Sequence, residues 1–344
     1  MCASPLKACV IGAGSWGTAL AHHLASAGHR VCLWAYEPEV AQAVNQEHQN
    51  PVYLPEVNLH PALASSSDLA QALGGAELVV LVMPSHVFRR VLGQAAPHLP
   101  ARALVVSCAK GIEQDTGYTM CEVAEEVLDK SFHRRLCCLS GPSFAKEVAK
   151  GVPTAVTVAS RVAEVAQRAQ LAFATPLFRV YTSPDLVGVE LGGAVKNPLA
   201  IAAGMVAGLK LGHNTLAALI TRGLAEMTRL AMARGGQLAT LSGLAGLGDL
   251  VLTCTSPQSR NFGVGVRLAR GEGIEEIKAS MRAVAEGVHN TQTVLGLAEQ
   301  AQVEMPIIRA VHGVIYRGQH PRQALHELMS RELTSELPHA PRRD

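Results

Sequence analysis

A glycine turn near the start of the chain constrains the fold more than any other feature. The motif GAGSWG at residues 12–17 follows an apolar run at residues 6–11 and opens an Ala/Leu-rich stretch at residues 16–27. A second apolar run follows at residues 30–34. A strand, a glycine turn, a helix and a strand in this order predict a βαβ unit. The chain is therefore expected to begin with strands that pair in parallel.

Apolar runs and helix-like stretches continue to alternate through the first half of the chain. Further strands are expected at residues 78–82, 103–107, 136–140 and 154–159, with helices at 85–96, 119–129 and 162–173. Strands that are apolar throughout are typical of a parallel sheet covered by helices on both faces.

From residue 186 onward the pattern changes to long Ala/Leu/Gly stretches with helical spacing, such as residues 215–233. We therefore predict an α/β Rossmann-type N-terminal domain with a mostly parallel sheet at residues 5–185. An all-α C-terminal domain is expected at residues 186–332, and a frayed tail at residues 333–344.

Composition argues against several classes of protein. Charged residues make up 17% of the 344 residues and the net charge is +2 with no long basic run, so nucleic-acid binding is not expected. The eight cysteines form no CxxC pair, which favours reduced thiols of a cytoplasmic protein over disulfides or a metal site. The first apolar stretch is short, and the longest wholly apolar or small run lies at residues 198–209. We therefore expect neither a signal peptide nor an integral membrane segment.

The glycine turn is a candidate dinucleotide site. Gly12 permits the sharp turn, Gly14 lets a pyrophosphate approach the backbone, and Gly17 lets helix and strand pack closely. The helix N-terminus supplies N–H donors to the phosphates. Glu37, 20 residues past Gly17, is either placed to meet an adenosine ribose or is a solvated turn residue. The stretch AYEPE holds no Arg or Lys for a 2′-phosphate, which favours NAD slightly unless Arg30 or a later residue folds over the site. A tight turn without a ligand is the alternative.

Lys196 is the sharpest candidate for acid–base chemistry. In LVGVELGGAVKNPLAIAAGMVAGL only Glu190 and Lys196 are charged. A lysine on a packed helix loses hydration, which lowers its pKa towards neutrality, where a general acid or base works. Pro198 removes a helical N–H, which could free a carbonyl or turn Lys196 and Asn197 outward. The alternative is a lysine that reaches the surface along its own stem.

Two further candidates follow expected strands. Lys110 comes just after the run at residues 103–107, and Gly111 beside it allows a close approach of the backbone. Ligands of open parallel sheets bind outside the carboxyl ends of the strands, so we expect Lys110 beside the cofactor. In LSGPSFAKEV, Ser143 is expected to cap a helix that starts at Phe144 and whose N–H groups face an anion.

A glycine-rich segment carries an acidic residue that needs a partner. LSGLAGLGDLVLTCTSPQSRNFGVG places Asp249 between glycine-rich and apolar runs, and Lys196 is the candidate to pair with it. The three glycines before Asp249 are unfavourable in a helix, so we expect a shaped loop. Ser259, Arg260 and Asn261 then offer a guanidinium and two hydrogen-bonding neighbours for a phosphate, although Arg260 also fits a solvated loop.

In combination these motifs resemble the bacterial NAD(P)-dependent glycerol-3-phosphate dehydrogenases. The resemblance rests on GAGSWGTALA, VMPSH, SCAKGIE, LSGPSFAKEV, ELGGAVKN, GLAGLGDLVLTCTS and SRN, which occur in the family's order within residues 7–331. It implies reversible reduction of dihydroxyacetone phosphate to sn-glycerol 3-phosphate with NADH or NADPH. It also implies a homodimer and a role in supplying the glycerophospholipid backbone.

The resemblance assigns roles position by position. Lys196 matches the proton-transferring residue, with Asn197 and Thr253 in support. The matched substrate-binding positions are Lys110, Gly141, Ser143, Lys196, Asp249, Ser259, Arg260 and Asn261. The matched cofactor-binding positions are Gly12, Gly14, Ser15, Trp16, Gly17, Tyr36, Lys110, Ala145, Arg260, Val284 and Glu286. Tyr36 stands where the family often has Arg or His, so the choice between NAD and NADP stays open.

Two other interpretations make different predictions. Another Rossmann-plus-helical dehydrogenase, of the 3-hydroxyacid or 6-phosphogluconate type, would act on a carboxylate substrate, and the segment GLGDLVLTC with the later SRN argues against it. A non-catalytic nucleotide-sensing module would bind without turnover, although every candidate catalytic position is filled.

Overall fold

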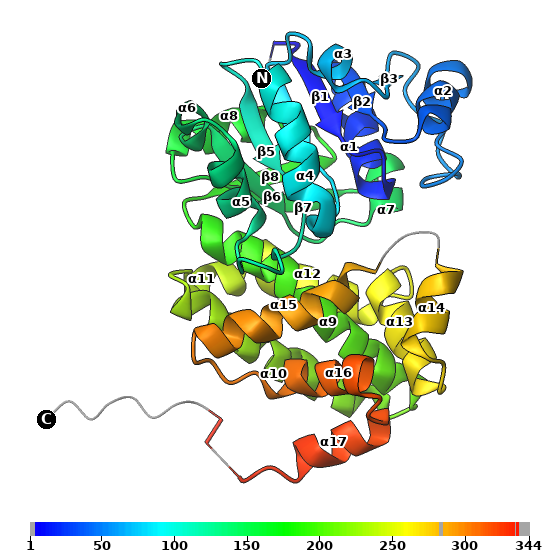
Figure 1. The fold of residues 1–344 in the computed structure, drawn as a ribbon, viewed down its shortest axis with the longest axis vertical. Helices are drawn as coiled ribbons and strands as arrows, with labels where there is room; N and C mark the ends of the chain where they lie inside the picture. The colour runs from blue at the N-terminus through cyan, green and yellow to red at the C-terminus, as the bar shows by residue number, and fades with distance from the viewer. Residues whose placement is uncertain (1–3, 282–284, 334, 337–344) are drawn as a thin grey trace, which may run out of the picture.

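The N-terminal half of the chain is built on one eight-stranded sheet (Figure 1). The computed structural model describes residues 4–281, 285–333 and 335–336. The strands are β1 (Lys7–Ile11), β2 (Arg30–Trp34), β3 (Ala64–Ser66), β4 (Leu78–Leu81), β5 (Leu104–Ser107), β6 (Leu136–Ser140), β7 (Thr154–Ala159) and β8 (Phe178–Ser183). They lie in the order β3-β2-β1-β4-β5-β6-β7-β8, and neighbours are parallel except for β6 and β7. The chain order reverses between β1 and β4, where open α/β sheets bind their ligands.

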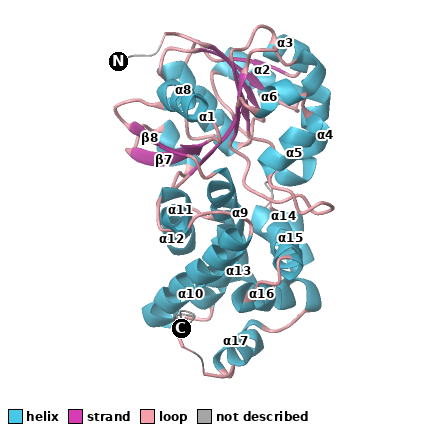
Figure 2. Ribbon diagram, turned by 90° about the vertical axis from the view of Figure 1, so that its left-hand side faces the viewer, coloured by secondary structure: helices cyan, strands magenta, loops and turns pink. Residues whose placement is uncertain are grey.

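Helices cover both faces of this sheet (Figure 2). They are α1 (Ser15–Ser26), α2 (Pro38–Glu47), α3 (Leu69–Leu73), α4 (Ser85–Ala95), η1 (Ala96–His98), α5 (Met120–Val127), α6 (Lys130–His133), α7 (Ala145–Ala149) and α8 (Ala163–Phe173). Helices α1, α2, α7 and α8 pack on one face, and α3 to α6 pack on the other. Successive residues of β4 divide between the two cores, Val80 on the first face and Val79 and Leu81 on the second. Both faces are therefore apolar, as the continuous strand patterns predicted.

Several details of the sheet differ from the prediction. β3 and β8 were not expected, because β3 is short and polar and β8 alternates apolar and exposed residues. β7 runs antiparallel to β6, since a run of apolar residues carries no information about strand direction. The helix expected at residues 119–129 ends with α5, and Asp129 caps the separate short helix α6.

In the described part of the chain after Ser183, the regular structure is helical. The elements are α9 (Leu186–Gly208), α10 (Gly212–Ala233), α11 (Leu238–Leu241), η2 (Leu244–Gly248), α12 (Asp249–Thr255), α13 (Arg260–Ala269), α14 (Ile274–Ser280), α15 (Glu286–Gln300), α16 (Pro306–Arg317) and α17 (Pro321–Met329). Helix α9 begins three residues after β8 ends and packs against α10, α12, α13 and α15 (Figure 2). A further core, separate from the two on the faces of the sheet, is built around α9.

Two helical stretches are long and apolar enough to cross a membrane by composition alone. One is α9, which begins 12 residues before Pro198 and continues through it. The apolar stretch is therefore longer than the run at residues 198–209 suggested. Its most apolar window is 94% buried inside the protein, as expected of a core helix. The other, Leu238–Thr255, is divided among α11, η2 and α12 and contains the buried Asp249. The frayed tail expected at residues 333–344 lies mostly outside the described residues.

Candidate active site

The glycine turn joins β1 to α1 at the carboxyl edge of the sheet. Gly12 has a φ of +115°, which L side chains rarely adopt, and a Cβ on Gly17 would lie 1.8 Å from the Gly12 carbonyl oxygen. Gly14 is the N-cap of α1 and places no side chain over the helix end, and a Cβ there would meet nothing within 4 Å. No side chain caps the start of α1, so its first N–H groups suit the phosphates of a dinucleotide.

The side chains at the turn and after β2 differ in their partners. Ser15 donates its hydroxyl to the Tyr53 carbonyl oxygen at 2.6 Å. The Trp16 indole N–H is buried and has no hydrogen-bond partner among the described residues. Tyr36 follows β2 and is 71% exposed. Glu37 accepts a hydrogen bond from the Tyr53 hydroxyl at 2.9 Å, so its carboxylate has a partner that the sequence reasoning missed.

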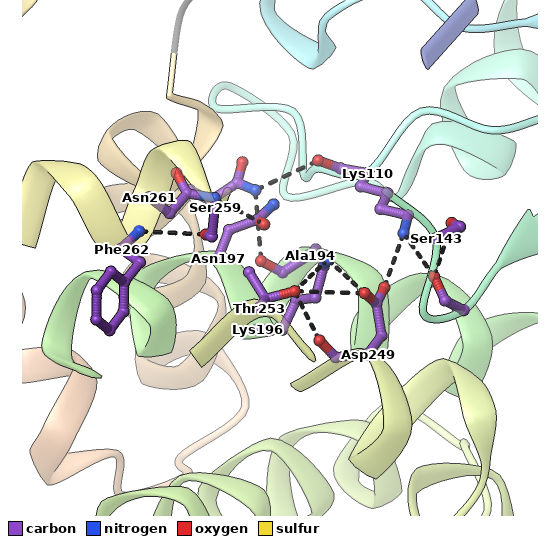
Figure 3. Close-up of polar contacts among 12 residues, drawn as sticks. Lys110, Ser143, Ala194, Lys196, Asn197, Asp249, Thr253, Ser259, Asn261 and Phe262 are labelled. Carbon is purple, nitrogen blue, oxygen red and sulfur yellow. Dashed lines mark hydrogen bonds and ion pairs between the residues drawn. The ribbon is translucent and has the colours of Figure 1, made fainter. Parts of the chain in front are cut away.

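Two lysines from different halves of the chain share one carboxylate. Lys196 of α9 donates to Asp249 Oδ1 at 2.6 Å, and Lys110, in the loop after β5, donates to Asp249 Oδ2 at 2.7 Å. Figure 3 shows both contacts converging on Asp249, the first residue of α12. Lys196 also donates to Thr253 Oγ1 at 2.8 Å, and that hydroxyl donates to the Asp249 carbonyl oxygen. The predicted pairing of Lys196 with Asp249 is present, and Lys110 joins it.

Burial and charge set the protonation of this cluster. The Lys196 side chain is 9% exposed, that of Asp249 is 1% and that of Lys110 is 16%. Burial is the main reason that the pKa of Lys196 falls to about 8; Asp249 opposes this shift, and Lys110 contributes to it. Burial alone would raise the pKa of Asp249, but the two neighbouring ammonium groups hold it below its ordinary value. The result is an ionised carboxylate beside a lysine that titrates close to neutral pH.

The segment after β6 differs from the prediction. Ser143 does not cap a helix: its hydroxyl donates to the Gly141 carbonyl oxygen at 3.0 Å, and Phe144 is the N-cap of α7, which starts at Ala145. The tight turn explains this, because Gly141 has a φ of +143° that directs the chain back towards Ser143. Lys110 Nζ also donates to the Gly141 carbonyl at 3.3 Å, so Gly141 and Ser143 do lie beside the lysine cluster.

The glycine-rich segment before Asp249 is helical rather than a loop. Residues Leu244–Gly248 form one π-helical turn that leads directly into α12. The absence of side chains allows this, since a Cβ on Gly246 would lie 2.1 Å from the Leu241 carbonyl oxygen. A Cβ on Gly192 of α9 would likewise lie 2.4 Å from the Ala245 carbonyl oxygen. The widened turn thus brings Asp249 close to α9.

A second polar group surrounds the start of α13. Ser259 is its N-cap and accepts a hydrogen bond from the Phe262 N–H at 3.2 Å, and Arg260 is the exposed first residue of the helix. Asn261 donates to Asn197 Oδ1 at 3.0 Å and accepts from the Gly287 N–H at 2.9 Å. The hydrogen bond between Asn197 and Asn261 therefore holds both side chains in place. Arg260 lies on the surface at the N-terminus of α13.

The remaining predicted residues lie at helix starts. Ala145 begins α7, and Glu286 begins α15. Burial raises the pKa of Glu286 to about 7, although the nearby Arg260 opposes the shift. Val284 lies outside the described residues.

One buried polar residue near the lysines escaped the sequence reasoning. Asn290 of α15 donates to the carbonyl oxygens of Lys110 and Ala194, each at 3.4 Å. The sequence gives little sign of it, because Asn290 stands beside Thr291 and Thr293, which are polar and buried as well. Within the described ranges, no three His, Cys, Asp or Glu side chains are grouped to hold a metal ion, and the seven cysteines there are free.

The fold and these contacts together define a class of protein. The glycine turn follows β1, and Lys110 follows β5 of the same sheet. Lys110 and the buried Lys196 of the helical domain both donate to Asp249. A Rossmann-like sheet joined in this way to a helical domain is the arrangement of a nicotinamide-dependent dehydrogenase.

Comparison with known proteins narrows the class to a family. Residues 7–166 match the profile of the NAD-dependent glycerol-3-phosphate dehydrogenase N-terminus, and residues 185–326 match that of its C-terminus. A glycerol-3-phosphate dehydrogenase [NAD(P)+] of Geobacter sp. (strain M21) is 52% identical over 96% of this chain and 98% of its own length. That of Anaeromyxobacter dehalogenans is 53% identical over 96% of this chain and 100% of its own.

A solved structure agrees with the sequence matches. The glycerol-3-phosphate dehydrogenase of Coxiella burnetii superimposes with a TM-score of 0.90 at 40% identity, covering 95% of this chain and 99% of the other. The chain belongs to the NAD-dependent glycerol-3-phosphate dehydrogenase family. It is an oxidoreductase that uses NAD or NADP.

Proposed function

We propose that this chain catalyses the reversible NAD(P)H-dependent reduction of dihydroxyacetone phosphate to sn-glycerol 3-phosphate. Membership of the family supports the reaction, and the open glycine turn with its uncapped α1 supports the cofactor. When bound, the reduced nicotinamide supplies a hydride to the substrate carbonyl carbon. The product is the backbone of glycerophospholipids, so the enzyme supplies their synthesis.

The buried Lys196–Asp249 pair is the observation that carries the proposal. Its ammonium donates a proton to the alkoxide that develops on the substrate oxygen, and in the reverse direction the neutral amine accepts it. A pKa of about 8 keeps both forms of Lys196 accessible near neutral pH. Asp249 and Thr253 hold the amine in place, and Asn197 is fixed on the next position of α9 by Asn261.

Charge complementarity supports the assignment of the binding residues. We assign the substrate to Lys110, Gly141, Ser143, Lys196, Asp249, Ser259, Arg260 and Asn261. The phosphate is assigned to the start of α13, where the guanidinium of Arg260 adds to the N-terminal N–H groups of a ten-residue helix. We assign the cofactor to Gly12, Gly14, Ser15, Trp16, Gly17, Tyr36, Lys110, Ala145, Arg260, Val284 and Glu286. The exposed Tyr36 would lie at the adenosine end, in the stretch AYEPE, which itself holds no Arg or Lys.

The test is oxidation of NADH and of NADPH by dihydroxyacetone phosphate, with Lys196→Ala and Lys210→Ala assayed beside the wild type. Lys210 is an exposed lysine just past the end of α9 and serves as the matched control. We expect Lys196→Ala to lower kcat by about 10²-fold or more, the scale of general acid–base catalysis, while NADH still binds in a fluorescence titration. Lys210→Ala should keep wild-type turnover.

The outcomes separate the alternatives. Near-normal turnover in Lys196→Ala would remove the lysine from the mechanism. Turnover of a carboxylate substrate in place of dihydroxyacetone phosphate would favour a 3-hydroxyacid dehydrogenase, and nucleotide binding without any turnover would favour a sensing module. We further propose a homodimer, on family resemblance, and a cytoplasmic location, which the free cysteines of the described chain support.

A further inference from the structure

Asn290 bridges the backbone of the two segments that carry the lysines. It lies on α15, has no exposed surface, and its side-chain nitrogen is 3.4 Å from the carbonyl oxygens of both Lys110 and Ala194. The first carbonyl belongs to the loop after β5 and the second to α9. Figure 3 shows the contacts that end on these two carbonyls. One amide group therefore touches both halves of the chain at the lysine cluster.

The Ala194 carbonyl is the one that Pro198 leaves without a helical partner. In an α-helix the carbonyl of residue 194 accepts from the N–H of residue 198, and proline has none. Leaving a buried carbonyl unpaired is costly, and the Asn290 amide takes the place of the missing donor. Lys196 lies between Ala194 and Pro198, so this contact acts on the turn of α9 that presents the catalytic amine.

The donor end of Asn290 is used while its acceptor end is not. Its Oδ1 is buried and has no hydrogen-bond partner among the described residues. A side chain kept only to fill space would be better served by an apolar residue, since an unpaired buried oxygen destabilises the fold. The two N–H groups are thus what the position requires.

We propose that Asn290 is a positioning residue. Together with Pro198, it holds the backbone of Lys110 and of Lys196 so that each ammonium group reaches its own oxygen of Asp249. The inference rests on the proposed function, because it gives the two lysines their roles. Asn290 acts through backbone carbonyls and touches neither ammonium group. Loss of its donors lets the loop after β5 and the Pro198 turn of α9 move relative to each other. Small displacements of catalytic groups lower kcat strongly.

The first test compares Asn290→Ala with Gln292→Ala, which removes an exposed amide from the same helix. We expect Asn290→Ala to lower kcat about tenfold or more and to raise KM for NAD(P)H by a much smaller factor, because Lys110 shifts while the glycine turn is not disturbed. Gln292→Ala should match the wild type. Thermal melting checks that each variant is folded. Should Asn290→Ala melt below the assay temperature, Asn290→Leu fills the same space without a donor and carries the same expectation.

The second test is a double-mutant cycle with Pro198→Ala, which restores an N–H to the Ala194 carbonyl. We expect Pro198→Ala to recover kcat about threefold or more in the Asn290→Ala background. The inference is overturned if Asn290→Ala keeps kcat within about twofold of wild type, if the loss falls on KM for the cofactor, or if Pro198→Ala gives no recovery. A wild-type enzyme inactive on dihydroxyacetone phosphate would instead overturn the proposed function.

Discussion

At the scale of single residues, Asp249 is the group that pairs with both lysines of the candidate site. Each of its carboxylate oxygens accepts from one ammonium group, Lys196 on Oδ1 and Lys110 on Oδ2. The three side chains carry a net charge of +1 in a buried place, which suits an anionic substrate and a developing alkoxide. The two neighbours act on Lys196 in opposite directions, since Asp249 raises its pKa and Lys110 lowers it.

Asp249→Asn and Lys110→Met should therefore shift the pH profile of reduction in opposite directions. In the proposed mechanism reduction needs protonated Lys196, so kcat should fall as pH rises through the pKa of Lys196, which is about 8 in the wild type. Removing the negative charge lowers that pKa and moves the alkaline limb to lower pH. Removing the second ammonium group raises the pKa and moves the limb to higher pH. Both are measured as kcat against pH at saturating substrate, and shifts of the same sign would contradict the assignment.

At the scale of secondary-structure elements, glycines let α13 pack directly on α9. A Cβ on Gly204 would lie 2.0 Å from the Phe262 carbonyl oxygen, and a Cβ on Gly265 would lie 2.0 Å from the Ile201 carbonyl oxygen. This close approach brings the start of α13, with Asn261, against Asn197 on α9. The end of α13 to which we assign the substrate phosphate is thus positioned by backbone contact between two helices.

Gly265→Ala and Gly263→Ala test this packing two residues apart on α13. Gly265→Ala should lower the free energy of unfolding by about 1–3 kcal/mol, because its methyl group must displace the backbone of α9. Gly263 has nothing within 4 Å of a built Cβ, so Gly263→Ala should raise stability by up to about 1 kcal/mol through helix propensity. Denaturant midpoints measure both. Equal effects of the two substitutions would show that the helices are not in backbone contact.

At the scale of the whole molecule, buried carboxyl groups join elements distant in the sequence. Glu190 of α9 accepts from the Thr119 hydroxyl and the Cys121 N–H, each at 2.8 Å, and so links the helical domain to the start of α5. Glu226 of α10 accepts from the Ile307 N–H at the start of α16. Burial raises the pKa of Glu190 and of Glu226 to about 7 in spite of these hydrogen bonds.

The stability of the protein should consequently depend on pH through Glu190. The pKa of Glu190 is about 7 in the folded protein, against about 4.3 for an unperturbed glutamate. At a pH between these two values, the folded state holds a proton that the unfolded chain has lost. Stability must then fall as pH rises through the window. Because Gln cannot ionise, the melting temperature of the wild type should fall relative to that of Glu190→Gln between about pH 5 and pH 8.

Glu164→Gln, at an exposed position of α8, provides the control and should show a constant difference from the wild type. A melting-temperature difference for Glu190→Gln that did not change with pH would mean that Glu190 keeps one protonation state throughout.

The sequence alone determined features that depend on neighbours along the chain or on the cost of burying charge. The glycine turn and the apolar strands follow from local sterics and from a sheet covered on both faces. The pairing of Lys196 with Asp249 followed because a charge inside an apolar stretch must find an opposite charge. The order and combination of the motifs also identified the family.

Other features were decided only by the tertiary structure. The direction of β7, the turn that takes Ser143 away from a cap and the π-helical turn before Asp249 depend on what packs against each segment. Lys110 reaches Asp249 across 139 positions of sequence, and Asn290 reaches the Lys110 carbonyl across 180. Hydrogen bonds form over about 3 Å in space, and a linear pattern contains no such distances.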